Sequence, residues 1–368
     1  MQEFFYDVVS GRKKNLSATL IRCGLQMLEM PYSAAVEGRN RLYDLNILAV
    51  DQFQIPMISV GNLTLGGTGK SPMTAWLVNL FLQKNVKPGL ISRGYKKEKN
   101  KTNDEHTNDE HKEMRWRFPD VPHLQNTSRA QAVRQLLKHE HHEHIDVIIL
   151  DDAFQHRQIR RDIDIVLLDA TAPFGFEHIF PRGTLRESVS QLRRADIVVL
   201  TRSDLIDEQS RQAIKRRVLS INPTAVWSEA VHRPTSLVSQ IVSQKSAVSQ
   251  KLLSGESIET IRGLSALAFC GIGNPPAFRH TLETCGVRVE KLIVYPDHYS
   301  YTDGDVAELR QTAQTFGTDL ILCTMKDLVK LTAPDARQQP IQAVAAEIQF
   351  SVGEETVCET LFSKLNLN

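Results

Sequence analysis

The sequence predicts an α/β fold, with a mostly parallel sheet covered by helices on both faces. Short apolar runs without polar alternation recur along the chain, as in strands that are buried on both faces. Segments with the apolar spacing of a helix separate these runs. The 368 residues exceed one ordinary domain, and the 41% hydrophobic content is enough to form buried cores.

The larger domain is predicted at residues 51–230, and a smaller C-terminal α/β domain at 263–368. Residues 231–262, rich in Ser, Val and Gln, are expected to form a linker or an extended ribbon. Strands are expected at 56–60, 88–92, 146–150, 164–168, 196–200, 264–270, 287–294 and 320–323. Helices are expected at 72–84, 128–138, 275–286 and 303–316.

Residues 1–50 precede the first strand and contain an amphipathic helical pattern. The apolar spacing includes Leu16, Leu20 and Leu28, and the basic residues 12–14 lie just upstream. Two interpretations fit this pattern. The helix packs on the protein's own core, or it lies on a membrane surface with the basic residues near lipid headgroups.

Composition and charge narrow the classes of function. The formal net charge is +1, so no global field draws the chain to nucleic acid, and no nucleic-acid partner is expected. The five cysteines are scattered and odd in number, which disfavours both a disulfide framework and a cysteine-rich zinc site. Neither a secretory signal nor a membrane-spanning segment is recognisable, so a protein that stays on the cytoplasmic side is expected.

A phosphate-binding loop is predicted between the first strand and the first helix of the larger domain. Glycines let successive backbone amides turn toward one anion, and the following helix points its positive dipole end at the same group. The lysine would reach the β- and γ-phosphates of a nucleoside triphosphate, and the serine would ligate Mg²⁺. The strict motif has glycine where this chain has Thr64, so the loop is a variant P-loop. Its residues are Gly66, Gly67, Thr68, Gly69, Lys70 and Ser71.

Two further predicted strand ends carry residues suited to a metal and phosphate site. Asp151 and Asp152 follow the buried run 146–150, where one carboxylate would hold Mg²⁺ directly or through water. Arg93 ends another strand and would neutralise phosphate charge. The sheet is therefore predicted to be of the P-loop NTPase type, and phosphoryl transfer is its expected reaction.

Together these motifs resemble the tetraacyldisaccharide 4′-kinase family, the lipid A 4′-kinases of Gram-negative bacteria. Ala153 departs from the family pattern, which usually has glycine there. The motifs that carry the resemblance are Gly61 to Pro72, Ser92-Arg93-Gly94-Tyr95, Asp151-Asp152-Ala153-Phe154-Gln155-His156, Pro181 to Glu187, Arg194-Ala195-Asp196, Cys270 to Pro275, Asp297 to Thr302 and Thr324-Met325-Lys326-Asp327.

The resemblance implies a reaction, a substrate and a location. The enzyme would transfer the γ-phosphate of ATP, with Mg²⁺, to the 4′-hydroxyl of a tetraacylated glucosamine disaccharide 1-phosphate. Because that lipid is reached in a bilayer, the resemblance favours the membrane interpretation of the N-terminal helix. It implies a peripheral or monotopic enzyme at the cytoplasmic face of the inner membrane, without an obligate protein partner. The implied substrate or phosphate contacts are Arg93, Tyr95, Gln155, Arg186 and Glu187, and Glu110 joins the metal ligands.

The resemblance also implies a catalytic Asp–His pair that accepts the proton of the acceptor hydroxyl. The histidine is His298, and Lys70 would absorb charge on the transferring phosphoryl group. The family aspartate belongs to a Gly-Asp-Glu-Pro loop that is not intact in this chain. Asp109 is the favoured match because it precedes a helix-like segment at 114–119. Asp104, in the tandem copy of the same short sequence, is the alternative.

Two other functions compete with the kinase. Nucleotide-dependent switch or maturation proteins share the Gly-Gly-Thr-Gly-Lys-Ser loop, but they need no histidine to activate an acceptor. An inactive relative of the kinase is suggested by the altered loop around Asp109. The Asp297-His298 motif and the segment 181–187 favour the kinase.

Overall fold

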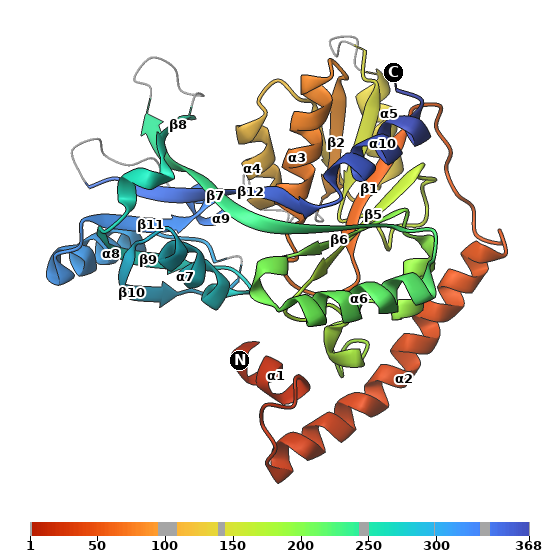
Figure 1. Cartoon of the computed structure of the whole chain (residues 1–368), viewed down its shortest axis with the longest axis horizontal. Helices are drawn as coiled ribbons and strands as arrows, with labels where there is room; N and C mark the ends of the chain where they lie inside the picture. Colours follow the sequence, from red (N-terminus) through yellow and green to blue (C-terminus); the bar gives the residue numbers. More distant parts are fainter. Residues whose placement is uncertain are drawn as a thin grey trace. The chain divides into compact units, whose positions relative to one another are not determined.

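The computed structural model of the chain divides into two compact units (Figure 1). The first contains Met1–Arg93, Leu124–Val231 and Ile348–Asn368, and the second contains Gly94–His123 and His232–Glu347. These units differ from the predicted contiguous domains, because 94–123 belongs to the second unit and 348–368 to the first. The structure describes residues 2–94, 109–138, 144–242, 250–297, 299–331 and 339–367.

The sheet of the first unit confirms the predicted mostly parallel α/β class. Its order is β7-β6-β5-β1-β4-β2-β3, and the pairs β1–β4, β1–β5, β2–β4, β5–β6 and β6–β7 are all parallel. The strands are β1 (Met57–Asn62), β2 (Pro88–Arg93), β3 (His123–Asn126), β4 (Val147–Asp151), β5 (Ile163–Asp169), β6 (Ile197–Thr201) and the first part of β7 (Val226–Val242).

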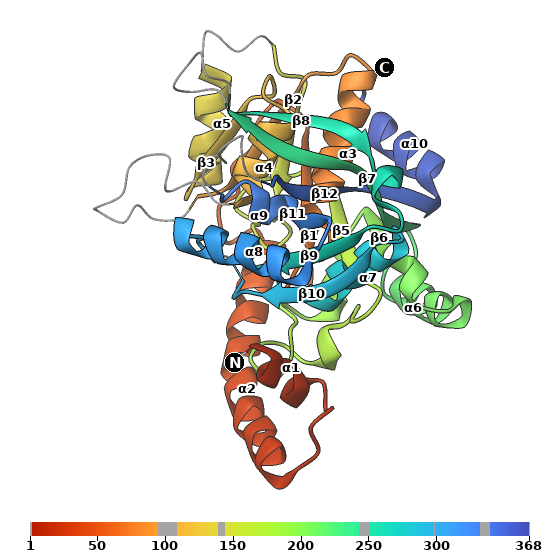
Figure 2. The same ribbon diagram turned by 90° about the vertical axis from the view of Figure 1, so that its left-hand side faces the viewer.

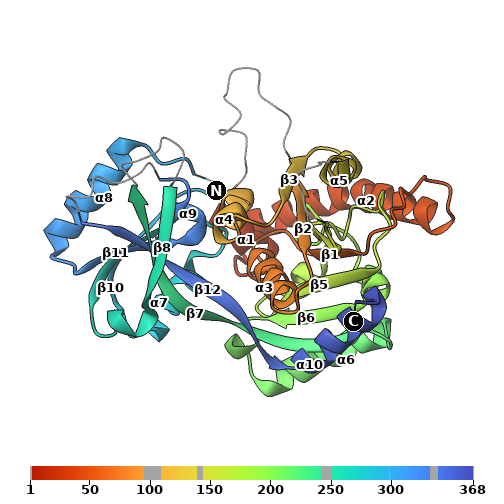
Figure 3. The same cartoon turned by 90° about the horizontal axis from the view of Figure 1, so that it is seen from above.

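Helices cover both faces of this sheet. On β4, Ile148 and Leu150 pack in one apolar cluster with α5 (Arg129–Lys138). Figures 1 and 3 show α5 and α3 (Lys70–Gln83) on opposite sides of β2. The remaining helices are α6 (Glu208–Ile221), which packs over β5 and β6, and α10 (Glu354–Leu365), whose Phe362 contacts Phe81 of α3.

The N-terminal segment forms α1 (Gln2–Val9) and α2 (Leu16–Asp44) within the first unit. Only Ala18, Asn40 and Tyr43 are buried among the residues of α2. Figures 1 and 2 show the N-terminal half of α2 extending beyond the sheet, with α1 beside it. The interpretation that this helix packs on the protein's own core therefore applies mainly to its C-terminal end. Across the described residues, no helix has the length and apolar content needed to cross a membrane.

The strands of the second unit are arranged in the order β10-β9-β11-β12-β7. The segment expected to be a linker or ribbon contains most of β7 and β8 (Gln250–Ser257), which pair antiparallel (Figure 2). The other strands are β9 (Ser265–Cys270), β10 (Arg288–Val294), β11 (Leu320–Thr324) and β12 (Ile341–Val352). The β10–β9, β11–β9 and β11–β12 pairs are parallel.

Two helices cover opposite faces of these strands. On β9, Leu267 and Phe269 pack in the cluster that contains α8 (Asp303–Phe316), whereas Ala266 and Ala268 pack in the cluster that contains α7 (Pro275–Thr284). Successive side chains of a strand point to opposite faces of the sheet, so each helix packs on alternate residues of β9. The unit also contains α4 (Asp109–Arg117) and α9 (Met325–Leu328).

A pair of buried histidines lies in the second unit near α4. The rings of His111 and His123 have centroids 4.0 Å apart. Burial, and secondly the charge of Arg115, lowers the pKa of His111 to about 4. Burial, followed by His111 and Arg115, lowers the pKa of His123 well below its ordinary value. Both rings are therefore neutral in the folded protein at neutral pH.

We expect the free energy of unfolding of the second unit to fall as pH is lowered from about 7.5 to about 5. Over that range the unfolded chain binds protons at histidines with a pKa of about 6.5, whereas folded His111 stays neutral. The loss attributable to His111 is about 2 kcal/mol at about pH 5. Hydrogen exchange across β9 to β11 at the two pH values measures it.

The His111→Phe variant removes the titrating group and keeps an aromatic ring, so its stability should depend less on pH. His280→Phe, at an exposed position of α7 in the same unit, is the matched control and should behave as the wild type. Equal pH dependence in the His111 variant and in the wild type would contradict this account.

Candidate nucleotide and phosphate site

The glycine loop between β1 and α3 has the geometry of an anion-binding nest. Gly66 and Gly69 have φ angles of 110° and 93°, a left-handed backbone conformation that favours glycine. Gly69 is the N-cap of α3 and offers no side chain to its first turn. Among the described residues, the amides of residues 66–69 donate to no protein acceptor. These donors and the helix dipole suit the phosphates of a nucleotide.

The strict motif has glycine at position 64, but the backbone conformation at Thr64 does not require one. Its φ is not positive, and its backbone forms an antiparallel bridge with Leu185. On either side, the Leu65 amide donates to Thr184 O at 2.6 Å and the Arg186 amide donates to Leu63 O at 2.7 Å. The predicted motif 181–187 thus forms a short ladder with the start of the loop.

A close approach at Gly61 brings the end of β4 against β1. A Cβ atom at Gly61 would lie 2.5 Å from Cβ of Phe154, a distance that real Cβ atoms do not reach. Glycine at this position therefore lets the chain after Asp152 pack directly on the strand that leads into the loop. Ala153, in place of the glycine usual in the family, is fully buried in the cluster beneath α5.

Asp152 is the centre of a charged cluster beside the loop. Its Oδ1 accepts a hydrogen bond from Arg186 Nη1 at 2.8 Å and lies 3.5 Å from Lys70 Nζ. Lys70 Nζ also lies 3.4 Å from Asn62 Oδ1. Burial opposes ionisation of Asp152, but Lys70, Arg186 and Arg129 outweigh it and lower the pKa to about 2. The carboxylate is therefore ionised at neutral pH.

The oxygens near the loop fit Mg²⁺ bound together with a nucleotide. Asp152 is ionised, Asp151 ends β4 beside it, and Ser71 offers a buried hydroxyl in the first turn of α3. In the described parts of the chain, no three acidic, histidine or cysteine side chains gather as an all-protein metal site. Mg²⁺ commonly takes one or two carboxylates and completes its shell with phosphate oxygens and water.

Gln155 and Glu187 lie together next to this cluster. The fully buried Glu187 accepts hydrogen bonds through Oε1 from Gln155 Nε2 at 3.0 Å and from Arg194 Nη2 at 2.7 Å. Gln155 Nε2 also donates to Asn62 O at 2.8 Å. The structure thus brings together Lys70, Ser71, Asp151, Asp152, Gln155, Arg186 and Glu187 from the sequence-based set.

Three residues outside the sequence-based set support the site. Thr201 Oγ1 donates to Thr68 O, and Arg202 Nη2 donates to Gly67 O, each at 2.9 Å. Arg129 Nη2 donates to the carbonyl oxygens of Asp151 and Asp152 at 2.9 and 2.8 Å. Thr201 and Arg202 directly follow a predicted strand, which is a usable signal because ligands bind at the carboxyl ends of parallel strands. Arg129 carries no comparable signal.

The remaining sequence-based residues lie elsewhere or outside the described part of the chain. Arg93 ends β2, which pairs with β4, and its side chain is exposed. Asp109 is the first residue of α4 in the second unit, but the structure does not describe its side chain. Tyr95, Asp104 and His298 lie outside the described residues. Glu110, also in the second unit, accepts a hydrogen bond from Lys326 Nζ at 2.9 Å.

We expect Lys70→Ala to lower the turnover of phosphoryl transfer at least about 100-fold, the scale of losing one charge-stabilising contact in a transition state. The structure strengthens this expectation because Lys70 Nζ already lies beside Asp152 at the loop. Steady-state kinetics with Mg-ATP measures the change. Lys84→Ala, at an exposed position after the far end of α3, is the matched control. Near-normal turnover of the Lys70 variant would remove this residue from the mechanism.

Comparison with known proteins places the chain in a family. The family model described as tetraacyldisaccharide-1-P 4′-kinase matches residues 21–366. A tetraacyldisaccharide 4′-kinase from Halothermothrix orenii is 30% identical over 92% of this chain and 90% of its own length. One from Pelodictyon phaeoclathratiforme is 33% identical over 83% of this chain and 86% of its own.

A solved structure agrees with these sequence relatives. LpxK from Aquifex aeolicus, in complex with ATP, superposes with a TM-score of 0.68 and 25% identity, over 94% of this chain and 99% of that one. The expectation drawn from the sequence motifs is thereby confirmed. With its glycine loop, its Asp152 cluster and a family match along nearly its whole length, this chain belongs to the tetraacyldisaccharide 4′-kinase family.

Proposed function

We propose that this chain transfers the γ-phosphate of ATP to the 4′-hydroxyl of a tetraacylated glucosamine disaccharide 1-phosphate, a step of lipid A biosynthesis. The observation that carries the proposal is the open glycine loop beside the Lys70, Asp152 and Arg186 cluster. Switch and maturation NTPases share the loop alone. The family match along 21–366 covers the rest of the chain as well.

The residues proposed to bind ATP and to stabilise the transferring phosphoryl group belong to the first unit. The amides of residues 66–69 and the N-terminus of α3 bind the phosphates of ATP. Lys70 and Arg186 stabilise the negative charge that develops on the transferring group. Ser71, Asp151 and Asp152 are proposed to hold Mg²⁺, which supplies further charge neutralisation between the phosphates. Glu110 is proposed as an additional ligand, and Arg93, Tyr95, Gln155 and Glu187 as substrate or phosphate contacts.

Asp109 and His298 are proposed to activate the acceptor hydroxyl. A sugar hydroxyl is a poor nucleophile until a base accepts its proton in the transition state, and a paired carboxylate and imidazole serve this purpose near neutral pH. Both residues belong to the second unit. Asp109 begins α4, and this helix is held on α9 by the ion pair between Glu110 and Lys326. The choice of Asp109 over Asp104 as the base rests on its position before the helix-like segment 114–119 in the sequence.

A membrane surface is the proposed partner, at the cytoplasmic face of the inner membrane. The large apolar side chains of α2 are widely exposed, which is characteristic of interaction surfaces. Basic residues at 12–14 precede the helix and suit anionic lipid headgroups. No obligate protein partner and no nucleic acid enter this proposal. The exposed side chains and their exposed fractions are Leu16 77%, Leu20 63%, Met27 74%, Leu28 60% and Met30 71%.

The kinase activity is tested with purified protein, labelled Mg-ATP and the acylated disaccharide 1-phosphate in detergent. We expect a labelled bisphosphate lipid that forms only when all components are present. If the protein hydrolyses ATP at the same rate with and without the lipid, and no labelled lipid forms, the result would instead support a nucleotide switch. No labelled lipid and no hydrolysis would support an inactive relative.

The two candidate bases are separated by comparing Asp104→Ala with Asp109→Ala in the same assay. We expect Asp109→Ala to lose at least about 100-fold in turnover, because general base catalysis contributes about 10²–10⁴-fold. Asp104→Ala should stay near the wild type and serves as the matched control. Equal activity of the two variants would discard the assignment.

Membrane association is tested with vesicles that contain anionic phospholipid. The double variant Leu20→Glu/Met27→Glu should bind at least about tenfold more weakly, since each buried leucine or methionine side chain contributes about 1.5–3 kcal/mol. Leu137→Glu, at an exposed position of α5, is the matched control. Unchanged co-sedimentation of the double variant would refute attachment through this face of α2.

A further inference from the structure

One buried polar side chain joins α2 to the phosphate site. Asn40 is 1% exposed on a helix whose other residues are almost all at the surface. Its Nδ2 donates a hydrogen bond to Glu187 Oε2 at 3.0 Å. The two residues lie 147 positions apart in the sequence, so this bond connects the N-terminal helix directly to the motif 181–187.

The Glu187 carboxylate is fully buried and depends on its donors. Burying an ionised carboxylate is costly unless hydrogen bonds and a cation compensate it. Arg194 supplies the cation, and Gln155 and Asn40 supply neutral donors. Asn40 is thus the only member of this set that comes from the N-terminal segment. Without it, Oε2 would lose its donor among the described residues.

From Glu187 a continuous series of contacts leads to the loop lysine. Gln155 accepts a hydrogen bond from Arg186 Nη1 at 3.4 Å through its Oε1. The same Arg186 atom donates to Asp152 Oδ1 at 2.8 Å, and this oxygen lies 3.5 Å from Lys70 Nζ. A shift of Glu187 would therefore move the amide that orients Arg186, the arginine proposed to face the transferring phosphate.

We propose that Asn40 is a positioning residue, through which the lipid-facing helix α2 holds Glu187 and thereby sets the orientation of Gln155 and Arg186 at the phosphate site. The inference deepens the proposed function and rests on it. Asn40 touches neither ATP nor the acceptor in this scheme, and it acts only through Glu187. A helix that seats the substrate lipid at the membrane is then also part of the support of the kinase site.

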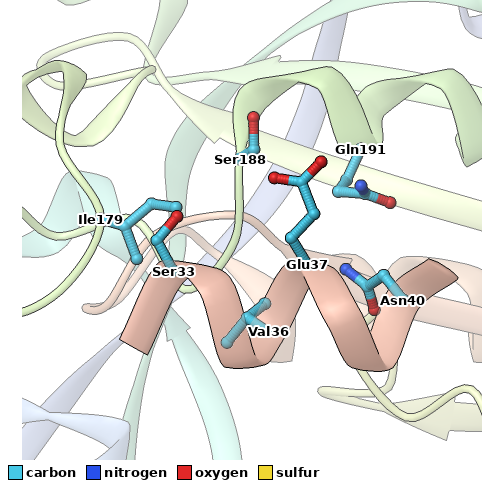
Figure 4. Close-up of a pocket in the computed structure, with 7 residues that line it drawn as sticks. All are labelled: Ser33, Val36, Glu37, Asn40, Ile179, Ser188 and Gln191. Atoms are coloured by element: carbon cyan, nitrogen blue, oxygen red, sulfur yellow. The ribbon is translucent and has the colours of Figure 1, made fainter. Parts of the chain in front are cut away.

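The surroundings of Asn40 show that the Glu187 bond is its main side-chain restraint. Asn40 lines a small pocket between α2 and the 3₁₀ helix η3 (Val189–Arg194), shown in Figure 4. Its Oδ1, and Oε1 of Gln191 across the pocket, have no hydrogen-bond partner among the described residues. The amide is therefore held by its nitrogen, and free space adjoins it. The other lining residues are Ser33, Val36, Glu37, Ile179 and Ser188.

A second anchor of the same helix end does not involve the Asn40 side chain and offers a matched control, although its Arg157 also donates to the Asn40 backbone carbonyl at 2.9 Å. Asp44 of α2 accepts hydrogen bonds from Arg157 Nη2 at 2.8 Å and from Arg193 Nη2 at 2.5 Å. These contacts fasten α2 to the same unit but do not involve Glu187. A loss that follows from loosening α2 in general should therefore appear in Asp44→Ala as well.

The test compares kcat, the KM for the lipid and vesicle binding of Asn40→Leu, Asn40→Gln and Asp44→Ala with the wild type. We expect Asn40→Leu to lower kcat about tenfold, the scale of one hydrogen bond to a charged group. The KM for the lipid and vesicle binding should stay within about twofold, because an effect on transition-state contacts appears in kcat. Asn40→Gln keeps the donor, has room for one methylene in the adjoining pocket, and should recover most of kcat.

Three results would overturn the proposal. They are an unchanged kcat in Asn40→Leu, an equal loss in Asp44→Ala, and a loss in Asn40→Gln as large as in Asn40→Leu. If Asn40→Leu does not fold, Asn40→Ala replaces it, since truncation only enlarges the existing pocket. A wild-type protein that forms no labelled lipid refutes the proposed function and this inference together. An active wild type with unaffected Asn40 variants refutes the inference alone.

Discussion

The parallel pairing of β1 with β4 is the constraint on which the phosphate site depends. Val60 pairs with Asp151 in this register, so the strand that leads into the glycine loop ends beside the two aspartates. Gly61 permits the approach, because any side chain there would collide with Phe154. Lys70, in the first turn of α3, then faces Asp152. A shift of this register by one residue would separate the loop from its acidic partner.

The charged side chains at the end of β4 are already paired with one another in the absence of a nucleotide. Asp152 keeps three cations close, namely Lys70, Arg186 and Arg129, and their fields in turn keep it ionised. Arg202 is paired with Asp169 and also donates to the loop at Gly67. A triphosphate brings more negative charge than Asp152 carries, so it meets cations that are already oriented. Such preorganisation is the main way in which phosphoryl-transfer sites stabilise their transition states.

The sequence predicted the sheet, the loop and most of the first-unit site because these features have strong local signals. Continuous apolar runs mark buried parallel strands, and a Gly-rich turn before Lys-Ser marks the loop. Arg129 and Asn40 were not predicted, because each acts through a contact with residues distant in the sequence. The two units were not predicted either, since the assignment of 94–123 to the second unit and of 348–368 to the first depends on contacts between residues distant in the sequence. The roles of Asp109 and His298 remain predictions that rest on the family pattern.

The return of the chain to the first unit has a consequence for synthesis. Residues 348–368 complete that unit: Phe350 packs on Trp76, Phe362 packs on Phe81, and Lys364 pairs with Asp196. Trp76 and Phe81 of α3 therefore lack these partners until the second unit has been synthesised. Since domains generally fold as units and N-terminal segments emerge first, the nucleotide-binding unit is completed last although its loop is made early. A nascent chain thus carries a P-loop on an unfinished scaffold for most of its translation.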